Sequence, residues 1–212
     1  MKKESRFLNK EHMKQQKKSR NNYLVMRHGQ GVTNLLHIVS RDGPYPLTPE
    51  GRLQAGETAR RLAQKEKIDI IVTSPVPRAK ETAEIVAVHT GISKIDIEPR
   101  FTEINFGIFE GKSVDEWKAF FSSRAERLIK PIPAGESFTE LRQRMIAGLM
   151  DIEKKYKDKT ILIVSHDDPL WVLYTTASCL KRKEALTLYM SKSPRTEMFL
   201  DFAQAVKMPY RI

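Results

Sequence analysis

The stretch YLVMRHGQGVTN, residues 23–34, decides the fold of this chain. Its first four residues form a continuous apolar run, which is typical of a strand buried on both faces of a parallel sheet. The run ends abruptly in Arg27, His28 and Gly29. Ligands of such sheets bind at the carboxyl ends of the strands, so a cation and an imidazole at this point indicate a binding pocket.

Strands and helices alternate along the rest of the chain. Short apolar runs bounded by Pro or Gly predict strands, and capping residues followed by apolar periodicity predict helices. The further predicted strands cover residues 68–74, 94–99 and 160–166, and the predicted helices cover residues 47–67 and 77–91 and follow Ser113 and Ser137. We therefore predict an α/β fold, a three-layer α/β/α sandwich with a mostly parallel central sheet.

Two of the predicted helices carry an apolar stripe that should pack on the sheet. In the helix over residues 47–67 the stripe is narrow and consists of Leu53, Ala59 and Leu62. The helix after Ser137 has apolar residues at spacings of three and four, namely Phe138, Leu141, Met145, Leu149, Ile152 and Tyr156. The pattern of residues 195–209 is ambiguous.

The positive charge of the chain is concentrated at its N-terminus. The 212 residues carry a net charge of +11, and residues 1–20 alone hold eight Lys or Arg against two Glu. We predict that residues 1–21 form a basic, flexible extension and that residues 22–212 form a single domain. The extension is a candidate for weak contact with RNA or another polyanion.

The composition argues against a membrane protein. No apolar run approaches the roughly 18 residues that a membrane span needs, and the polar N-terminus has no apolar signal segment. The one cysteine, Cys179, lies in an apolar stretch and is predicted to be a buried thiol in a reducing compartment. We therefore predict a cytoplasmic protein without a membrane partner, and the oligomeric state stays open.

Polar residues follow three of the predicted strands and should meet at one edge of the sheet. They are Arg27-His28-Gly29, then Arg78 beyond Ser74, then His166. Arginine binds phosphate oxygens bidentately, a neutral imidazole is a nucleophile, and a glycine allows close approach and can offer an N–H. These residue types favour phosphoryl transfer to or from a small phosphorylated substrate. No group of metal ligands is visible, so we predict a reaction without metal or cofactor.

The chain resembles the histidine phosphatase superfamily, in the branch that includes phosphoglycerate mutases, over about residues 22–180. The resemblance is carried by six segments in the family's order. They are RHGQGVTN (27–34), LTPEGRLQA (47–55), TSPVPRAKETA (73–83), FTEINFGIFEG (101–111), PAGES (133–137) and VSH (164–166).

The resemblance implies a double displacement at His28, which would be phosphorylated and then dephosphorylated by water. Arg27, Arg78 and His166 would bind the phosphate, and Asn34 would be a further contact. It also implies that Glu103 protonates the leaving oxygen and later activates water. That role favours a carboxyl group whose pKa is raised.

Three positions depart from the family's pattern. Gly31 stands where a Ser or Thr is common, Asp167-Asp168 replace a Gly-Gly after His166, and Trp171 replaces an arginine. Two acids beside a phosphate pocket should repel an anionic substrate unless one is turned away or protonated. Asp167 is also a second candidate acid, because His166-Asp167 resembles the dipeptide of the acid-phosphatase branch. Alternatively, the two acids could select a substrate that carries a positive charge.

We expect a metal-independent phosphomonoester hydrolase, and two alternatives stay open. The first is a mutase that returns the phosphoryl group to its substrate. The second is a noncatalytic, accessory domain of a larger and RNA-associated protein. The segment YMSKS (189–193) is similar to a loop of class I aminoacyl-tRNA synthetases, but no companion motif accompanies it.

Overall fold

The computed structural model describes residues 19–177 and 205–208 of the chain. At its centre is a five-stranded sheet in the order β3-β2-β4-β1-β5. The strands are β1 (Asn22–Arg27), β2 (Ile70–Thr73), β3 (Ile95–Ile97), β4 (Thr160–Ser165) and β5 (Ala205–Lys207). The first four run parallel to their neighbours, and β5 pairs antiparallel with β1. The prediction of a mostly parallel sheet is confirmed.

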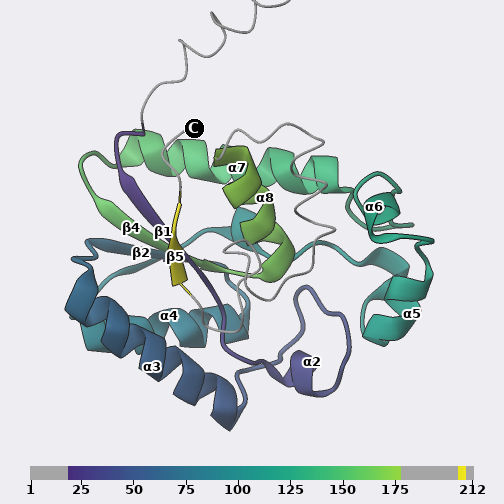
Figure 1. Cartoon of the computed structure of the whole chain (residues 1–212), viewed down its shortest axis with the longest axis horizontal. Helices are drawn as coiled ribbons and strands as arrows, with labels where there is room; N and C mark the ends of the chain where they lie inside the picture. The colour runs from purple at the N-terminus through teal and green to yellow at the C-terminus, as the bar shows by residue number, and fades with distance from the viewer. Residues whose placement is uncertain (1–18, 178–204, 209–212) are drawn as a thin grey trace, which may run out of the picture.

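Helices cover both faces of this sheet, with α3 and α4 on one side and α7 and α8 on the other (Figure 1). The α-helices are α2 (Val32–Leu35), α3 (Pro49–Lys65), α4 (Pro77–Thr90), α5 (Val114–Ala119), α6 (Arg124–Arg127), α7 (Phe138–Lys155) and α8 (Asp167–Ala177). Two 3₁₀ turns, η1 (Pro99–Phe101) and η2 (Gly107–Phe109), follow β3. The three-layer sandwich is thus confirmed.

The alternation of side chains along β1 divides the core in two. Leu24 and Met26 belong to the cluster under α3 and α4, whereas Tyr23 and Val25 belong to the cluster under α7 and α8. Successive residues of a strand point to opposite faces, so a strand buried on both sides must be apolar throughout. This is why the apolar run before Arg27 predicts its place in the sheet.

The two predicted helical stripes have different outcomes. The stripe of α7 is confirmed for its members within the helix, which are buried: Phe138, Leu141, Met145, Leu149 and Ile152. Tyr156, the last predicted member, is the C-cap residue and is only partly buried. The stripe of α3 is wrong at Leu53, whose side chain is 61% exposed. The buried apolar side chains of α3 are Ala55, Ala59 and Leu62. At 3.6 residues per turn these three share one face, and Leu53 lies two residues from Ala55, on the other side.

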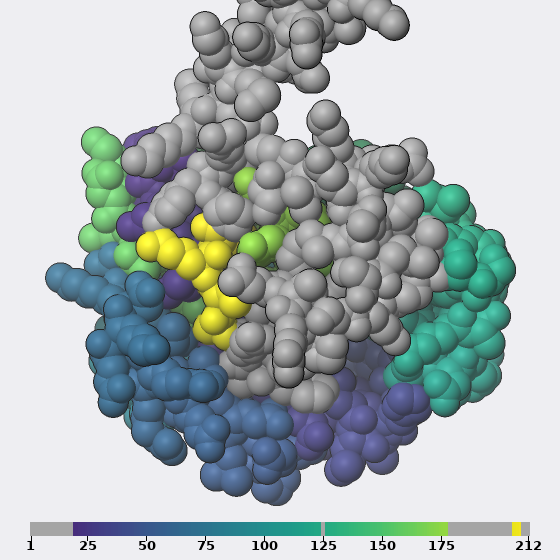
Figure 2. Space-filling model, viewed as in Figure 1, coloured from purple at the N-terminus to yellow at the C-terminus, as the bar shows by residue number. Residues whose placement is uncertain are grey.

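The two ends of the chain are described only in part. Ser19 and Asn21 both bind Glu153 of α7, and the Nδ2 atom of Asn21 lies 2.8 Å from a carboxylate oxygen of Glu153. Residues 1–18 of the predicted extension, Cys179 and the segment 189–193 lie outside the described residues. The ambiguous range 195–209 contributes β5, which lies at the surface on the face seen in Figure 2. None of the helices in the described part of the chain has the length and apolarity to cross a bilayer.

Candidate active site

Three parallel strands end together at one edge of the sheet. The ends of β1 and β4 are in register at Arg27 and Ser165, and β2 ends at Thr73 beside β4. The residues that follow β1 and β4, His28 and His166, therefore lie next to one another, with ring centroids 5.0 Å apart. The convergence expected from the sequence thus occurs.

His28 is held as a neutral ring with a defined tautomer. Its side chain is buried, and Nδ1 lies 2.6 Å from the carbonyl oxygen of Gly29. A carbonyl only accepts hydrogen bonds, so Nδ1 carries the proton and Nε2 keeps its lone pair. Burial, followed by the charges of Arg78 and Arg27, lowers the pKa of His28 well below its ordinary value. The ring is therefore a neutral base with Nε2 available as the nucleophile.

Arg78, in the first turn of α4, brings a buried cation to this nucleophile. Its Nε donates to Nε2 of His28 at 3.1 Å, and its Nη2 donates to the carbonyl oxygen of Ser40 at 3.0 Å. The remaining nitrogen, Nη1, is buried and makes no hydrogen bond to a described residue. A guanidinium group with one unsatisfied buried nitrogen is suited to bind an anion that reaches His28.

His166 forms the opposite side of the same pocket. Its Nε2 lies 2.9 Å from the hydroxyl oxygen of Ser74, whereas Nδ1 is buried without a hydrogen-bond partner among the described residues. Burial, followed by the charge of Arg78, lowers the pKa of His166 well below its ordinary value. His166 is thus a neutral ring in this structure.

Glu103 follows η1 and is a buried carboxyl group. Its Oε1 accepts a hydrogen bond from the backbone N–H of Ile104 at 2.9 Å. Burial and then the negative charge of Asp168 raise the pKa of Glu103 to about 8, against the opposing effect of Arg78. Glu103 therefore carries a proton at neutral pH, as a general acid requires.

The two acids that depart from the family's pattern are both paired with arginines. Asp168 is buried and forms an ion pair with Arg127 of α6. The guanidinium group of Arg127 also stacks on the ring of Trp117, 3.8 Å from its centroid. Asp167 is more exposed, and its carboxylate lies 3.8 Å from a guanidinium nitrogen of Arg27. Arginine pairing thus offsets the repulsion that these acids would exert on a phosphate.

The family model described as "Histidine phosphatase superfamily (branch 1)" matches residues 23–197 of the chain. The chain belongs to this superfamily. The match includes the three strand ends that carry the candidate site.

Relatives of this histidine phosphatase have names of two kinds. It is 33% identical to "Uncharacterized phosphatase PhoE" of Bacillus subtilis, over 73% of this chain and 76% of that protein. It is also 33% identical to "Probable phosphoglycerate mutase GpmB" of Erwinia tasmaniensis, over 73% of each chain. Its fold is similar to a phosphoserine phosphatase of Entamoeba histolytica solved with 3-phosphoglyceric acid, with a TM-score of 0.71, 23% identity, and 91% and 94% of the two chains covered.

Gly29 shapes the loop after β1. Its N–H donates to the hydroxyl of Thr82 at 3.1 Å, and phosphate binding by Gly29 stays a prediction. A Cβ atom on Gly29 would lie 2.2 Å from the carbonyl oxygen of Gly51, in the first turn of α3. The glycine is needed because the loop after β1 passes directly over the start of that helix.

Asn34 and Gly31 shape the loop that follows the nucleophile. The Oδ1 atom of Asn34 accepts a hydrogen bond from the N–H of Gly31 at 2.9 Å. This contact closes the loop onto α2, and phosphate binding by Asn34 stays a prediction. A Cβ atom on Gly31 would lie 2.9 Å from Cδ of Arg78, so the small residue leaves room for the arginine side chain.

Several residues that shape the site are not singled out by the sequence. Ser40 binds Arg78, and Ser74 binds His166. Arg127 pairs with Asp168, and Arg144 binds the backbone of the segment that carries Glu103. Of these, only Ser74 lies in one of the six motif segments, directly after a strand, and that position could have indicated a role in the site. The arginines lie on helices, and their partners are distant in the sequence.

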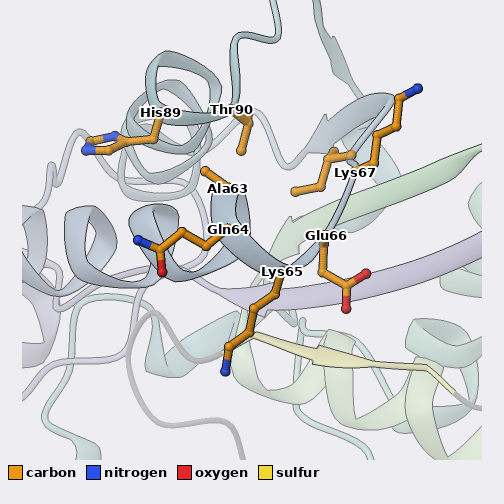
Figure 3. Close-up of a pocket in the computed structure, with 8 residues that line it drawn as sticks. Ala63, Gln64, Lys65, Glu66, Lys67, His89 and Thr90 are labelled. Carbon is orange, nitrogen blue, oxygen red and sulfur yellow. The ribbon is translucent and has the colours of Figure 1, made fainter.

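A separate cavity of about 400 Å³ lies away from these residues. It is formed by the ends of α3 and α4, near the start of β2, and Gln64, Lys65 and Lys67 point in different directions around it (Figure 3). No three His, Cys, Asp or Glu side chains within residues 19–177 and 205–208 are grouped as metal ligands. Reaction without a metal or cofactor nevertheless stays a prediction.

Proposed function

We propose that this histidine phosphatase hydrolyses small phosphomonoesters through a phosphohistidine on Nε2 of His28. The observation that carries the proposal is the hydrogen bond from Nδ1 of His28 to the carbonyl of Gly29, which leaves Nε2 unprotonated beside Arg78. A neutral nucleophile and a cation at the same point are what attack on an anionic phosphate requires.

In the first step Nε2 forms a bond to phosphorus, and the bond between phosphorus and the leaving oxygen breaks. The leaving oxygen takes the proton of Glu103, so the product leaves as an alcohol. The ring of His28 becomes positively charged, and the Gly29 carbonyl stabilises this charge through Nδ1–H. Arg27, Arg78 and His166 bind the phosphate oxygens.

In the second step water replaces the leaving group. The carboxylate of Glu103 takes a proton from water, the water oxygen bonds to phosphorus, and the bond between phosphorus and Nε2 breaks. Inorganic phosphate leaves, and His28 returns to the neutral tautomer. A carboxyl with a pKa of about 8 can serve both steps near neutral pH, because its protonated and ionised forms are close in free energy. We prefer Glu103 to Asp167 as the acid, because Asp167 is more exposed and faces Arg27.

A mutase acting on phosphoglycerate is the second candidate, because relatives carry that name. The carboxylates of Asp167 and Asp168 make it the less favoured one. A phosphoglycerate brings a carboxylate of its own, and Arg127 is already paired with Asp168. Arg27 and Arg127, which pair with Asp167 and Asp168, are therefore less able to bind that second carboxylate.

The two candidates differ in the fate of the phosphoryl group. Incubation with ³²P-labelled phosphomonoesters should label His28, and the H28A variant should stay unlabelled. Phosphate release from 3-phosphoglycerate and small sugar phosphates should proceed without a bisphosphate primer. Interconversion of phosphoglycerates that depends on such a primer would favour the mutase. Absence of label on His28 under all these conditions would support a noncatalytic domain.

A further inference from the structure

The segment that carries Glu103 has few backbone partners of its own. It leaves η1 at Phe101 and reaches η2 at Gly107 without joining a strand or an α-helix. A buried backbone needs partners for its carbonyl groups. Here a side chain of α7 supplies them. Arg144 donates to the carbonyl oxygens of Arg100, Thr102 and Glu103 at 2.5, 2.8 and 2.9 Å.

The guanidinium group of Arg144 is itself fixed by Glu136. Its Nε and Nη2 donate to the two carboxylate oxygens of Glu136 at 2.5 and 2.8 Å, and both side chains are mostly buried. Glu136 also accepts from the N–H of Asn105 at 3.3 Å and donates its own N–H to the carbonyl of Asn105 at 3.0 Å. The pair therefore holds the segment on both sides of Glu103.

Arg144 makes no hydrogen bond to the described residues of the phosphate pocket, and its charge is only one of the smaller influences that lower the pKa of His166. That pocket consists of groups at the ends of β1 and β4 and in the first turn of α4, whereas Arg144 binds carbonyl oxygens of the acid-bearing segment. The planar guanidinium group of arginine has five N–H donors and can bind three carbonyl oxygens and a carboxylate together, which the ammonium group of lysine cannot do. The geometry thus connects Arg144 to the proton donor rather than to the phosphate.

We propose that Arg144, held by Glu136, is a positioning residue that aims the carboxyl group of Glu103 at the leaving oxygen. This proposal rests on the proposed role of Glu103 as the general acid. Displacement of a catalytic group by about 1 Å can cost on the order of 100-fold in rate. Loss of Arg144 should therefore weaken proton donation and leave phosphate binding intact.

The test uses esters that differ in their need for an acid. A 4-nitrophenyl phosphate has a good leaving group and needs little protonation, whereas phenyl and alkyl phosphates need it fully. We expect R144K, which keeps the charge, to reduce kcat/KM for alkyl phosphates by about 10- to 100-fold. The loss for 4-nitrophenyl phosphate should be less than about threefold, and inhibition by inorganic phosphate should be unchanged. E136Q should show the same pattern to a smaller extent.

Two further variants make the result specific to Glu103. R142K is the matched control, because Arg142 lies on the same helix but binds Thr176 of α8, and it should have no effect. In the double variant E103Q/R144K the second substitution should cost nothing more, since the acid is already absent. Circular dichroism and Tm of each variant check that it is folded, and E136Q provides the same test if R144K is not.

The outcomes separate the two proposals. Suppose that E103Q loses more kcat/KM on alkyl phosphates than on 4-nitrophenyl phosphate, as its role as acid requires. The positioning role of Arg144 would then be overturned if R144K lost kcat/KM equally on both esters. It would also be overturned if the losses of E103Q and R144K multiplied in the double variant. No such dependence on the leaving group in E103Q itself would overturn the role of Glu103, and the inference about Arg144 with it.

Discussion

Nε of Arg78 donates a hydrogen bond to Nε2 of His28 at 3.1 Å, so a buried guanidinium group lies directly against the lone pair of the candidate nucleophile. The two residues are contributed by α4 and by the end of β1, 50 positions apart. An anion that takes the place of this contact would meet the cation and the nucleophile together. The first two predictions follow from this pair.

Replacement of Arg78 by lysine should reduce kcat/KM by about 100- to 1,000-fold, because an ammonium group cannot form the bidentate contact that a phosphate needs. The measurement is steady-state hydrolysis of one aryl phosphate, together with inhibition by inorganic phosphate. R52K is the control, since Arg52 pairs with Glu81 on the surface of α3. Equal activity of R78K and R52K would rule out Arg78 as a phosphate ligand.

His28 should remain neutral, with its proton on Nδ1, as the pH is lowered through 6.5. Burial and the arginine charges lower its pKa, and the Gly29 carbonyl fixes the tautomer. Nitrogen-15 NMR of the imidazole rings checks both points, with H28Q to assign the signal. A protonated ring at pH 6.5, or a proton on Nε2, would contradict the assignment of Nε2 as nucleophile.

Phosphorylation of the enzyme should slow as the pH rises through about 8, where Glu103 loses its proton. Asp168 raises this pKa through its negative charge. In the D168N variant this fall in the phosphorylation rate, the alkaline limb of the pH profile, should therefore occur at lower pH. Rapid-quench measurement of the phosphoenzyme over a pH series gives the limb directly. E103Q should have no such limb, and a limb that persists in E103Q would assign it to another group.

Stability should also report the raised pKa of Glu103. Between an ordinary value of 4.5 and about 8 the folded protein keeps a proton that the unfolded chain releases, so stability from this group falls as the pH rises through that range. E103Q removes this loss. Its free energy of unfolding relative to the wild type should increase by about 3 kcal/mol between about pH 5.5 and 8. The exposed E57Q serves as control in urea denaturation, and an E103Q difference as flat as that of E57Q would contradict the raised pKa.

Two glycines of α3 should respond in opposite ways to alanine. A Cβ atom on Gly51 would lie 2.1 Å from the carbonyl oxygen of Gln30, so G51A should destabilise the protein by about 2–4 kcal/mol. The nearest atom to a Cβ on Gly56 is a flexible arginine nitrogen at 3.7 Å, so G56A should stabilise the helix by about 0.5–1 kcal/mol. Thermal denaturation of both variants checks the pair. Similar Tm values for the two would mean that the loop after His28 does not pack on α3 as described.

Much of this molecule follows from sequence periodicity. The strand before Arg27 and the apolar stripe of α7 are local patterns. The rule that parallel strands end at one edge of the sheet then brings His28 and His166 together. Even so, a local pattern misplaced Leu53, because the choice among the faces of α3 is made by the helix and sheet that pack against it.

The chemical properties of the site were decided by the tertiary structure. The sequence identified Glu103 as an acid, but its raised pKa comes from burial and from Asp168, 65 residues away in the chain. Likewise, the sequence showed two acids after His166, and only the folded chain pairs Asp168 with Arg127. Periodicity depends on neighbours along the chain, whereas desolvation and Coulomb interactions depend on neighbours in space, and for that reason the strands were readable from the sequence and the protonation states were not.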